Sequence, residues 1–155
     1  MPIEIERKFR VVGDSWRDGV RRVRRFSQAY LALGELVSVR VRISDERSAT
    51  LTVKTAAAGL ARSEYEYAIP LADARELIEQ RQGASIEKLR HDLPMADLTW
   101  EIDVFEGLNA GLVIAEIELD HTERAIELPA WVGEEVTHDR RFYNAELAVR
   151  PFSSW

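Results

Sequence analysis

The strongest constraint on the fold of this chain is a two-residue alternation of charged and apolar side chains at its start. In residues 3–9, Ile-Glu-Ile-Glu-Arg-Lys-Phe, the charged side chains of Glu4, Glu6 and Lys8 stand at every second position. Successive side chains of a β-strand point to opposite faces, so these three charges share one face and the apolar side chains share the other. The segment therefore predicts an amphipathic strand whose charged face lies either in solvent or in a polar interior.

The same alternation recurs along the chain. Charged residues at a spacing of two are Arg40 and Arg42, Glu64 and Glu66, Lys88 and Arg90, Glu101 and Asp103, and Glu116 and Glu118, and Lys54 ends a further alternating segment. The solvated face of an antiparallel sheet usually also carries Thr, Ser, Gln and Asn. Here the alternating polar positions are almost wholly charged, which indicates that these residues share one face and one role.

Turn-forming residues divide the chain into short strands. After the opening strand we expect strands near residues 28–33, 37–44, 48–55, 61–69, 85–92, 98–106 and 112–120. Asp45-Glu46-Arg47 suits a hairpin turn, and residues 56–59 form a loop of small side chains. No repeat or low-complexity linker interrupts this pattern, so we expect one domain over residues 1–155.

An arginine-rich segment follows the first strand. Asp14 or Ser15 could cap a short helix that continues through Val23. Its exposed side would carry Arg17, Arg21, Arg22, Arg24 and Arg25. No aromatic residues interleave with these arginines, so we interpret them as a solvated helix face rather than as an anion-binding patch.

Further short helices are expected in the second half of the chain. Asp73 and Glu76 have the spacing of a capping box for a helix that ends by residue 83. A short helical segment is expected from Thr122, and Thr137 or Asp139 could begin a final helix. The predicted fold class is thus α+β, with a mainly antiparallel β-sheet and a few short flanking helices.

About eight antiparallel strands can close into a barrel whose interior is lined by alternate residues. If the apolar set lies inside, the charges face solvent. If the charged set lies inside, the barrel is a tunnel, and its charges need ionic partners, a metal or a charged ligand. That tunnel would be lined by Glu4, Glu6, Lys8, Arg40, Arg42, Lys54, Glu64, Glu66, Lys88, Arg90, Glu116 and Glu118.

A charged tunnel of this composition suits one class of ligand. Arginine and lysine from several strands suit a compact polyanion with many phosphate oxygens. Paired glutamates suit a hard divalent cation such as Mg²⁺ or Mn²⁺. A metal-bearing chain of phosphates satisfies both sets, and the implied chemistry is phosphoryl transfer to a metal-activated water.

Composition excludes several alternatives. The net charge of −6 and the pI near 5.2 argue against a nucleic-acid partner. The chain has no cysteine and no apolar run long enough to span a membrane, so we expect a cytoplasmic protein without a membrane partner. His91, His121 and His138 lack metal-motif spacing and are expected at the surface or in the core. Trp155 could mark a homodimer contact.

These motifs resemble the CYTH superfamily, the triphosphate tunnel metalloenzymes. The resemblance begins with Glu4-x-Glu6-x-Lys8 and spans nearly the whole chain. It continues through Arg40-x-Arg42, Lys54, Glu64-x-Glu66, Glu87-Lys88-x-Arg90, Asp103-x-Phe105-x-Gly107, Glu116-x-Glu118 and the segment from Trp131 to Asn144. In one departure, Phe142 stands where many small relatives have tyrosine.

The resemblance implies an eight-stranded closed tunnel that binds triphosphate with divalent metal. It implies metal ligands at Glu4, Glu6, Glu116 and Glu118, assisted by Glu64 and Glu66. It implies phosphate-binding residues at Lys8, Arg40, Arg42, Lys54, Lys88 and Arg90, and catalytic roles for Glu4, Glu6, Lys88, Glu116 and Glu118. Tyr30, Arg62 and Asp103 are further expected tunnel residues.

The chain most resembles the small bacterial members of the family, which hydrolyse inorganic tripolyphosphate. The resemblance therefore implies a small-molecule triphosphate substrate, which would be hydrolysed to pyrophosphate and phosphate. Other relatives are adenylate cyclases, RNA triphosphatases and thiamine triphosphatases, so an organic triphosphate stays open. A non-catalytic polyphosphate or nucleotide sensor is a further alternative. The intact set of acidic positions favours catalysis.

Overall fold

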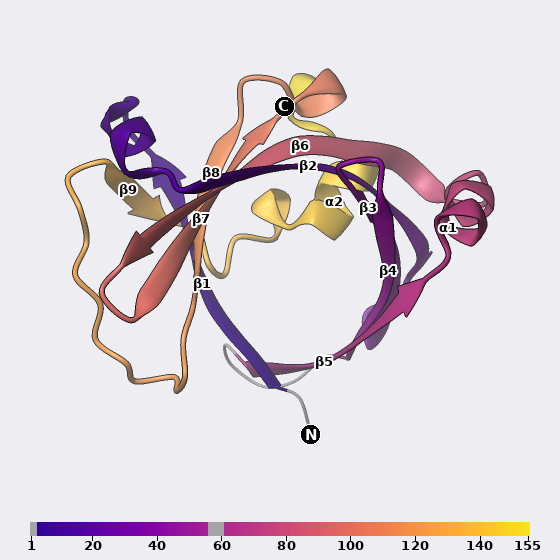
Figure 1. The fold of residues 1–155 in the computed structure, drawn as a ribbon, viewed down its shortest axis with the longest axis horizontal. Coiled ribbons are helices and arrows are strands. Elements are labelled where there is room, and N and C mark those ends of the chain that lie inside the picture. The colour runs from indigo at the N-terminus through magenta and orange to yellow at the C-terminus, as the bar shows by residue number, and fades with distance from the viewer. Residues whose placement is uncertain (1–2, 56–60) are drawn as a thin grey trace.

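A computed structural model describes residues 3–55 and 61–155 and contains one antiparallel sheet that closes on itself (Figure 1). The strands are β1 (Ile3–Val11), β2 (Arg22–Leu33), β3 (Val37–Ser44), β4 (Ser48–Thr55), β5 (Ala61–Ile69), β6 (Gln82–Met95), β7 (Leu98–Phe105), β8 (Val113–Glu118) and β9 (Val132–Glu135). The loop expected at residues 56–59 lies outside the described residues.

Closure comes from pairing between the first and fifth strands. The strand order is β5-β4-β3-β2-β6-β7-β8-β1-β9, and β1 also pairs with β5. Eight strands therefore form a barrel, as predicted, and β9 is added beside β1. β9 was not expected from the sequence. In the ring β3 and β8 are four strands apart in either direction, so they lie on opposite sides of the barrel.

The helix predicted after the first strand is wrong, because a β-strand begins at Arg22. Only a single 3₁₀ turn, η1 (Ser15–Gly19), forms before it. The expected solvent exposure holds for Arg17, Arg21, Arg22 and Arg25, whereas Arg24 is only half-exposed. β2 begins at Arg22 and pairs with β6, with Arg22 opposite Asp92 and Arg24 opposite Arg90. The physical reason is that β6 offers a long ladder of backbone partners, and tertiary pairing overrides local helix propensity.

The helices are short and differ in detail from the expectations. α1 (Leu71–Ile78) follows Pro70, and no side-chain hydrogen bond caps it, so the Asp73–Glu76 capping box is wrong. No helix forms from Thr122. The expected last helix is divided into η3 (Arg140–Phe142), which Asp139 caps by accepting from the Arg141 backbone N–H, and α2 (Asn144–Val149). The remaining 3₁₀ turns are η2 (Gly107–Asn109) and η4 (Phe152–Ser154).

None of the described helices is long and apolar enough to cross a membrane.

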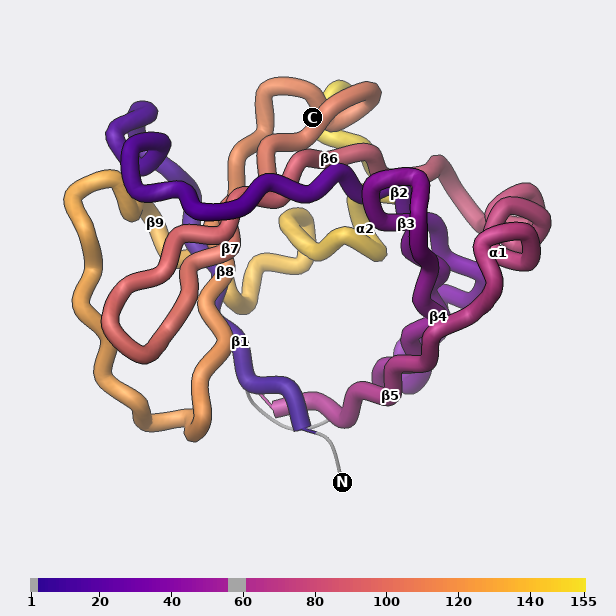
Figure 2. Tube along the Cα trace, in the orientation of Figure 1, coloured from indigo at the N-terminus to yellow at the C-terminus, as the bar shows by residue number. Residues whose placement is uncertain are grey.

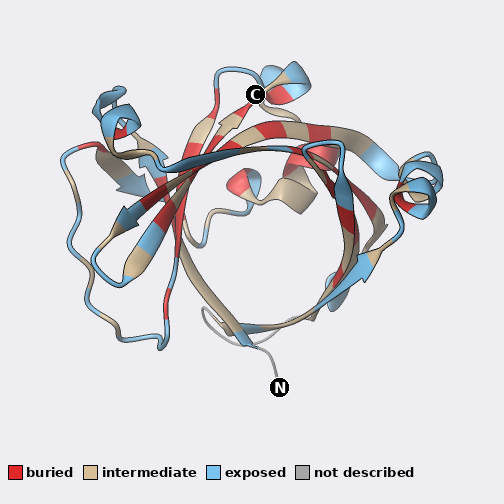
Figure 3. Ribbon diagram, viewed as in Figure 1, coloured by how far each residue is buried: buried red, intermediate tan, exposed pale blue. Residues whose placement is uncertain are grey.

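Much of the apolar core packs against the outside of the barrel. Figure 3 marks the buried residues in red along the strands. On one side, η1 and the segment before β9 cover β1, β7 and β8, where Trp100 packs edge-on against Phe9 and Trp131 at centroid distances of 5.6 and 5.2 Å. On another side, α1 buries Ala74 against Val41. Because these outer faces take the apolar side chains, alternation directs the charged set inward.

α2 lies within the outline of the ring, as the tube of Figure 2 shows (yellow). Leu147 and Ala148 pack into an apolar cluster with Tyr30 and Ile86 from β2 and β6. Gly83 has φ of +72°, and a Cβ at this position would lie 2.5 Å from the carbonyl oxygen of Ala148. Only glycine permits this close approach. The C-terminal helix is thereby fixed at one end of the barrel.

Candidate active site

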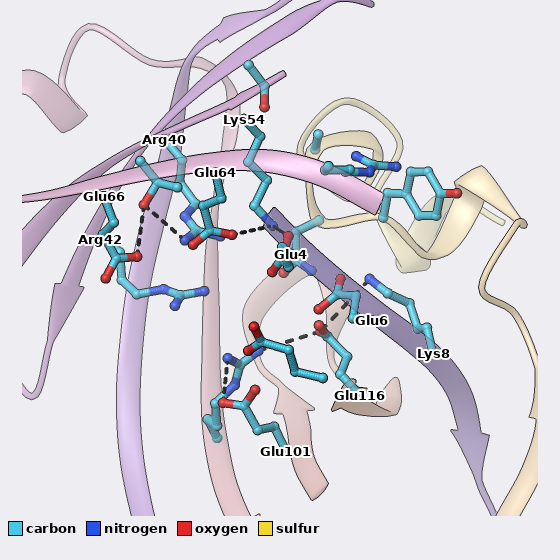
Figure 4. Close-up of a pocket in the computed structure, with 18 of the residues that line it drawn as sticks. Glu4, Glu6, Lys8, Arg40, Arg42, Lys54, Glu64, Glu66, Glu101 and Glu116 are labelled. Atoms are coloured by element: carbon cyan, nitrogen blue, oxygen red, sulfur yellow. Dashed lines mark hydrogen bonds and ion pairs between the residues drawn. The ribbon is translucent and has the colours of Figure 1, made fainter. Parts of the chain in front are cut away.

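The barrel encloses a cavity of about 340 Å³ whose lining is almost wholly charged or polar (Figure 4). The expected residues that line it are Glu4, Glu6, Lys8, Tyr30, Arg40, Arg42, Lys54, Arg62, Glu64, Glu66, Lys88, Arg90, Glu116 and Glu118. Asp103 is fully buried and is not among the described lining residues. Of the two interiors that the sequence allowed, the charged one is therefore found.

Strand register brings the acidic side chains together. β1 pairs with β8 so that Glu6 lies opposite Glu118 and Lys8 lies opposite Glu116. β8 pairs with β7 so that Glu116 also lies opposite Glu101. We call Glu4, Glu6, Glu116 and Glu118, on β1 and β8, the acidic wall.

The carboxylates of the acidic wall disfavour one another's charge. Burial, and then the charges of Glu116 and Glu4, raise the pKa of Glu6 well above its usual value. Burial also raises the pKa of Glu118, with added repulsion from Glu4, Glu101 and Glu64. These groups hold more negative charge in one place than the neighbouring cations stabilise.

Glu116 behaves in the opposite way. Although burial opposes its ionisation, Lys8, Arg90 and Lys88 hold the pKa of Glu116 well below its usual value. Its carboxylate lies 3.9 Å from the Lys8 ammonium and 3.5 Å from the Arg90 guanidinium. The neighbouring cations thus favour the ionised form of Glu116.

The donor set of the acidic wall fits a hard divalent cation. Such cations take carboxylate oxygens, and a cation here would offset the burial and the repulsion between carboxylates that together raise the pKa of Glu6, Glu4 and Glu118. Within the described residues no three Asp, Glu or His side chains already form a metal site. Water or ligand oxygens would complete the coordination of such a cation, since Mg²⁺ usually binds through one or two carboxylates and keeps several waters.

Five of the cations that line the cavity are paired with carboxylates, and one of them is Arg24, which lies 2.8 Å from Asp92. The Lys54 ammonium lies 2.8 Å from Glu4 and 3.5 Å from Glu64. The Lys8 ammonium faces Glu116. The other two, Lys88 and Arg90, share Asp103.

Asp103 holds Lys88 and Arg90 from within the sheet. It accepts a 2.6 Å hydrogen bond from Lys88 and two 2.8 Å hydrogen bonds from Arg90. Burial, with the charges of Arg90 and Arg42, lowers the pKa of Lys88 to about 7 against the pull of Asp103. Burial also disfavours the charge of Arg90, but Asp103 and Glu101 keep the Arg90 pKa well above its usual value. Asp103 therefore orients both cations.

Arg40 and Arg42 on β3, which we call the arginine wall, are held differently. Arg40 donates to the Thr52 hydroxyl at 3.2 Å, and its Nε is buried without a hydrogen-bond partner in the described structure. Arg42 donates to the side-chain oxygen of Gln28 at 2.8 Å. Burial, Arg40 and Arg90 lower the pKa of Arg42 to about 9. In the described residues neither arginine has a carboxylate within 4.0 Å, so both keep charge for an anion.

Aromatic and amide groups from the C-terminal segment complete the cavity. The Tyr143 hydroxyl donates to the Thr137 carbonyl at 2.9 Å, and its ring lies 5.5 Å from the Lys8 ammonium and 5.2 Å from the Arg62 guanidinium. Asn144, the first residue of α2, accepts from Lys88 at 2.9 Å. Phe142 instead packs in the core, 5.1 Å from the Trp155 ring. The tyrosine at this end of the cavity is thus Tyr143.

Several lining residues had no role in the sequence-based prediction. Arg24 enters from β2, which was expected to be helical there, and His138, which is exposed as the expectation of a surface position allows, lies at the cavity. Thr52, Tyr143 and Asn144 are neutral and gave no charge signal, although Thr52 stands two residues before Lys54 on the same face of β4. His91 is buried and His121 is exposed, in agreement with the expectation for these two histidines.

The chain is similar to known proteins along nearly its whole length. The family model described as CYTH domain matches residues 2–143. An inorganic triphosphatase of Acetivibrio thermocellus is 41% identical over 98% of this chain and 97% of its own. An inorganic triphosphatase of Nitrosomonas europaea is 33% identical over 94% of this chain and 97% of its own.

Solved structures with a similar fold cover most of the chain. The crystal structure of an inorganic triphosphatase, 31% identical, superposes with a TM-score of 0.70 and covers 96% of each chain. A protein from Pyrococcus horikoshii, 20% identical, superposes with a TM-score of 0.64 over 77% of this chain and 81% of its own, and this likeness concerns the fold alone.

Proposed function

This chain belongs to the CYTH domain family, and we propose that it hydrolyses inorganic tripolyphosphate to pyrophosphate and phosphate with a divalent cation. The observation that carries the proposal is the cavity, in which cations that suit phosphate oxygens face carboxylates that suit a metal. The names of the two relatives, both inorganic triphosphatases, support the same reaction.

The residues of the cavity divide the work of binding. Arg40 and Arg42 bind phosphate oxygens, and Lys8, Lys54, Lys88 and Arg90 neutralise the rest of the chain of phosphates. Glu6, Glu116 and Glu118 would hold Mg²⁺ or Mn²⁺, with Glu4 beside them and Glu64 and Glu66 assisting. When bound, such a cation neutralises charge on phosphate oxygens and lowers the pKa of a water molecule so that it can attack phosphorus.

The protein's own contribution is positioning and charge placement. Asp103 fixes Lys88 and Arg90 by buried hydrogen bonds, so these donors need little reorganisation when charge develops on the leaving phosphate. The enclosing barrel keeps these charges in a poorly solvated space, where they act more strongly than in water. Apart from Tyr30, His138, Tyr143 and Ala145, the described lining consists of charged, hydroxyl and amide side chains, which suit phosphate oxygens rather than a nucleobase. This composition favours an inorganic substrate over an organic triphosphate.

Phosphate release should be measured side by side from tripolyphosphate, ATP, thiamine triphosphate and pyrophosphate, with Mg²⁺, with Mn²⁺ and with chelator. The expected result is fast release from tripolyphosphate alone, abolished by chelator. A preference for an organic triphosphate would retain the tunnel and contradict the substrate. Tight binding without turnover on any of the four would identify a sensor instead of an enzyme.

A further inference from the structure

The ring of Phe26 on β2 lies among three guanidinium groups of the cavity. The centroid of the ring is 4.1 Å from the guanidinium carbon of Arg42, 5.2 Å from that of Arg24 and 5.3 Å from that of Arg90. The side chain is almost fully buried, at 1% exposure. An aromatic ring attracts cations through its quadrupole and carries no net charge, so it can hold a guanidinium without neutralising it.

The three arginines differ in their other partners. Arg24 pairs with Asp92 at 2.8 Å, and Arg90 pairs with Asp103 at 2.8 Å. Arg42 has no carboxylate within 4.0 Å in the described part of the chain, and it lies closest to the ring. The ring therefore matters most for Arg42, the one of the three whose charge is not already balanced by an acid.

Gln28 supplies the second neutral contact. It lies directly opposite Arg42 in the β2–β3 register, and its side chain is fully buried. Its Oε1 accepts from Arg42 Nε at 2.8 Å, while its Nε2 donates to Asn144 Oδ1 at 3.2 Å. The Asn144 contact fixes the amide so that its oxygen faces the guanidinium.

We propose that Phe26 and Gln28 are positioning residues that hold Arg42 by neutral contacts alone and so leave its charge for a substrate phosphate. This inference rests on the proposed function, since it assigns the phosphate to the same cavity. A carboxylate in either place would orient Arg42 equally well, but it would occupy the guanidinium and repel the polyanion. The neutral pair gives orientation without that competition.

The direct test replaces Phe26 with mono-, di- and trifluorophenylalanine. Fluorine withdraws electron density from the ring face and weakens its attraction for cations with little change in shape. Tripolyphosphate binding in chelator is measured by calorimetry, and KM and kcat are measured with metal. We expect Kd and KM to rise stepwise, by roughly three- to tenfold at trifluorophenylalanine, with kcat nearly constant.

Two controls separate positioning from packing. The same series at Phe9, which packs against Trp100 in the outer core, should leave Kd and KM unchanged. In an Arg42→Ala background most of the fluorine effect at Phe26 should vanish, because the ring acts through Arg42. A purely structural role for Phe26 predicts no graded response and no such coupling.

Gln28 gives a second, independent variant. Gln28→Glu keeps the shape and the hydrogen bond to Arg42, loses the donor to Asn144 and adds a competing charge, so KM should rise at least tenfold. Gln28→Met, which removes both hydrogen bonds of the amide without adding a charge, should raise KM less. An equal KM in Gln28→Glu and wild type, or a flat fluorine series at Phe26, would overturn the inference.

The outcomes also separate this inference from the proposed function. Normal hydrolysis of tripolyphosphate with no fluorine dependence refutes only the role of Phe26 and Gln28. If wild-type protein binds tripolyphosphate without hydrolysing it, the proposed function fails, and the binding series still decides the positioning role. If wild-type protein neither binds nor hydrolyses it, both fail.

Discussion

The arginine wall and the acidic wall lie on opposite sides of one barrel, and they are stabilised in different ways. On β3, Arg40 and Arg42 rest on a hydroxyl, an amide and an aromatic ring, all of them neutral. On β1 and β8, the carboxylates crowd one another, and burial with this repulsion raises the pKa of Glu6 well above its usual value. The arginine wall presents positive charge that is not paired with a carboxylate in the described residues, and the acidic wall has an excess of negative charge.

This difference shows which ligand each wall is ready to accept. The arginine wall can accept an anion without first breaking an ion pair, so its binding geometry exists before the substrate arrives. On the acidic wall Glu4 and Glu116 have cationic partners, whereas in the described residues Glu6 and Glu118 have no Lys or Arg within 4.0 Å, so a ligand must bring the missing positive charge. A phosphate chain that carries a divalent cation supplies both needs, whereas a bare phosphate supplies only the first. Four predictions test this division.

The largest effect is expected on the acidic wall. Glu4→Gln or Glu118→Gln should lower kcat for tripolyphosphate at least tenfold, and up to about a hundredfold, because each removes a charged support of the cation. The fold should be intact by circular dichroism. Binding of tripolyphosphate in chelator should be unchanged or tighter, since it depends on the opposite wall. A near-normal kcat in both variants would show that Glu4 and Glu118 do not support a catalytic metal ion.

The second effect is expected on the arginine wall. Arg42→Ala should raise KM for tripolyphosphate by roughly tenfold, the scale of one lost hydrogen bond to a charged group. The same loss should appear in calorimetry with chelator, where the acidic-wall variants show none. If Arg42→Ala binds tripolyphosphate normally in chelator but has a lower kcat, the arginine wall does not act in binding separately from the acidic wall, and the proposed division is contradicted.

A smaller effect is expected where the support of Arg40 is removed. Thr52→Val deletes the hydroxyl that accepts from Arg40 and donates to Glu66 at 3.3 Å, and it should raise KM by about three- to fivefold. Thr50→Val, on the same strand and outside the described cavity lining, is the matched control and should leave KM unchanged. Equal effects of the two substitutions would assign the change to packing.

The smallest effect is a change in stability that depends on pH. Because the folded pKa of Glu6 is raised, folding favours its protonated form, and stability is lost as pH rises above the unfolded value through the folded value. Glu6→Gln removes that loss. In chelator at pH 8 its Tm should therefore exceed that of wild type by about 2–4 °C, the response of a chain of this size to 1 kcal/mol.

Glu116→Gln is the matched contrast on the same wall. The folded pKa of Glu116 is depressed, so its ionised form contributes stability above the unfolded value, and this contribution is lost as pH falls through the folded value. Its Tm at pH 8 should fall below that of wild type. If Glu6→Gln were also destabilising at pH 8, the excess of negative charge on the acidic wall would be refuted.

Much of the charged half of the site could be predicted from the sequence. Alternation places Glu4, Glu6 and Lys8 on one face, and the recurrence of the pattern indicates that the faces meet. Which face lies inside could not be decided from alternation alone, because a barrel with its apolar set inside has the same pattern. The resemblance to a tunnel family favoured the charged interior, and the barrel confirms it.

The neutral half of the site could not be predicted. Phe26 and Gln28 have the composition of ordinary core and strand residues, and their role depends on Arg42, which the register of β2 with β3 brings opposite. The start of β2 was mistaken for a helix because its partner residues in β6 lie about seventy positions later in the chain, as Arg22 opposite Asp92 shows. Asp103 had a charge signal, but only the structure shows that it supports two cations from beneath the cavity surface.

The most direct test of the division is a crystal structure with tripolyphosphate and Mn²⁺, using the anomalous signal of manganese to place the cation. The account predicts phosphate oxygens within hydrogen-bond distance of Arg40 and Arg42, and a manganese peak between the phosphates and the carboxylates of Glu6 and Glu116. A peak away from β1 and β8, or phosphates that leave both arginines of β3 without a contact, would contradict it.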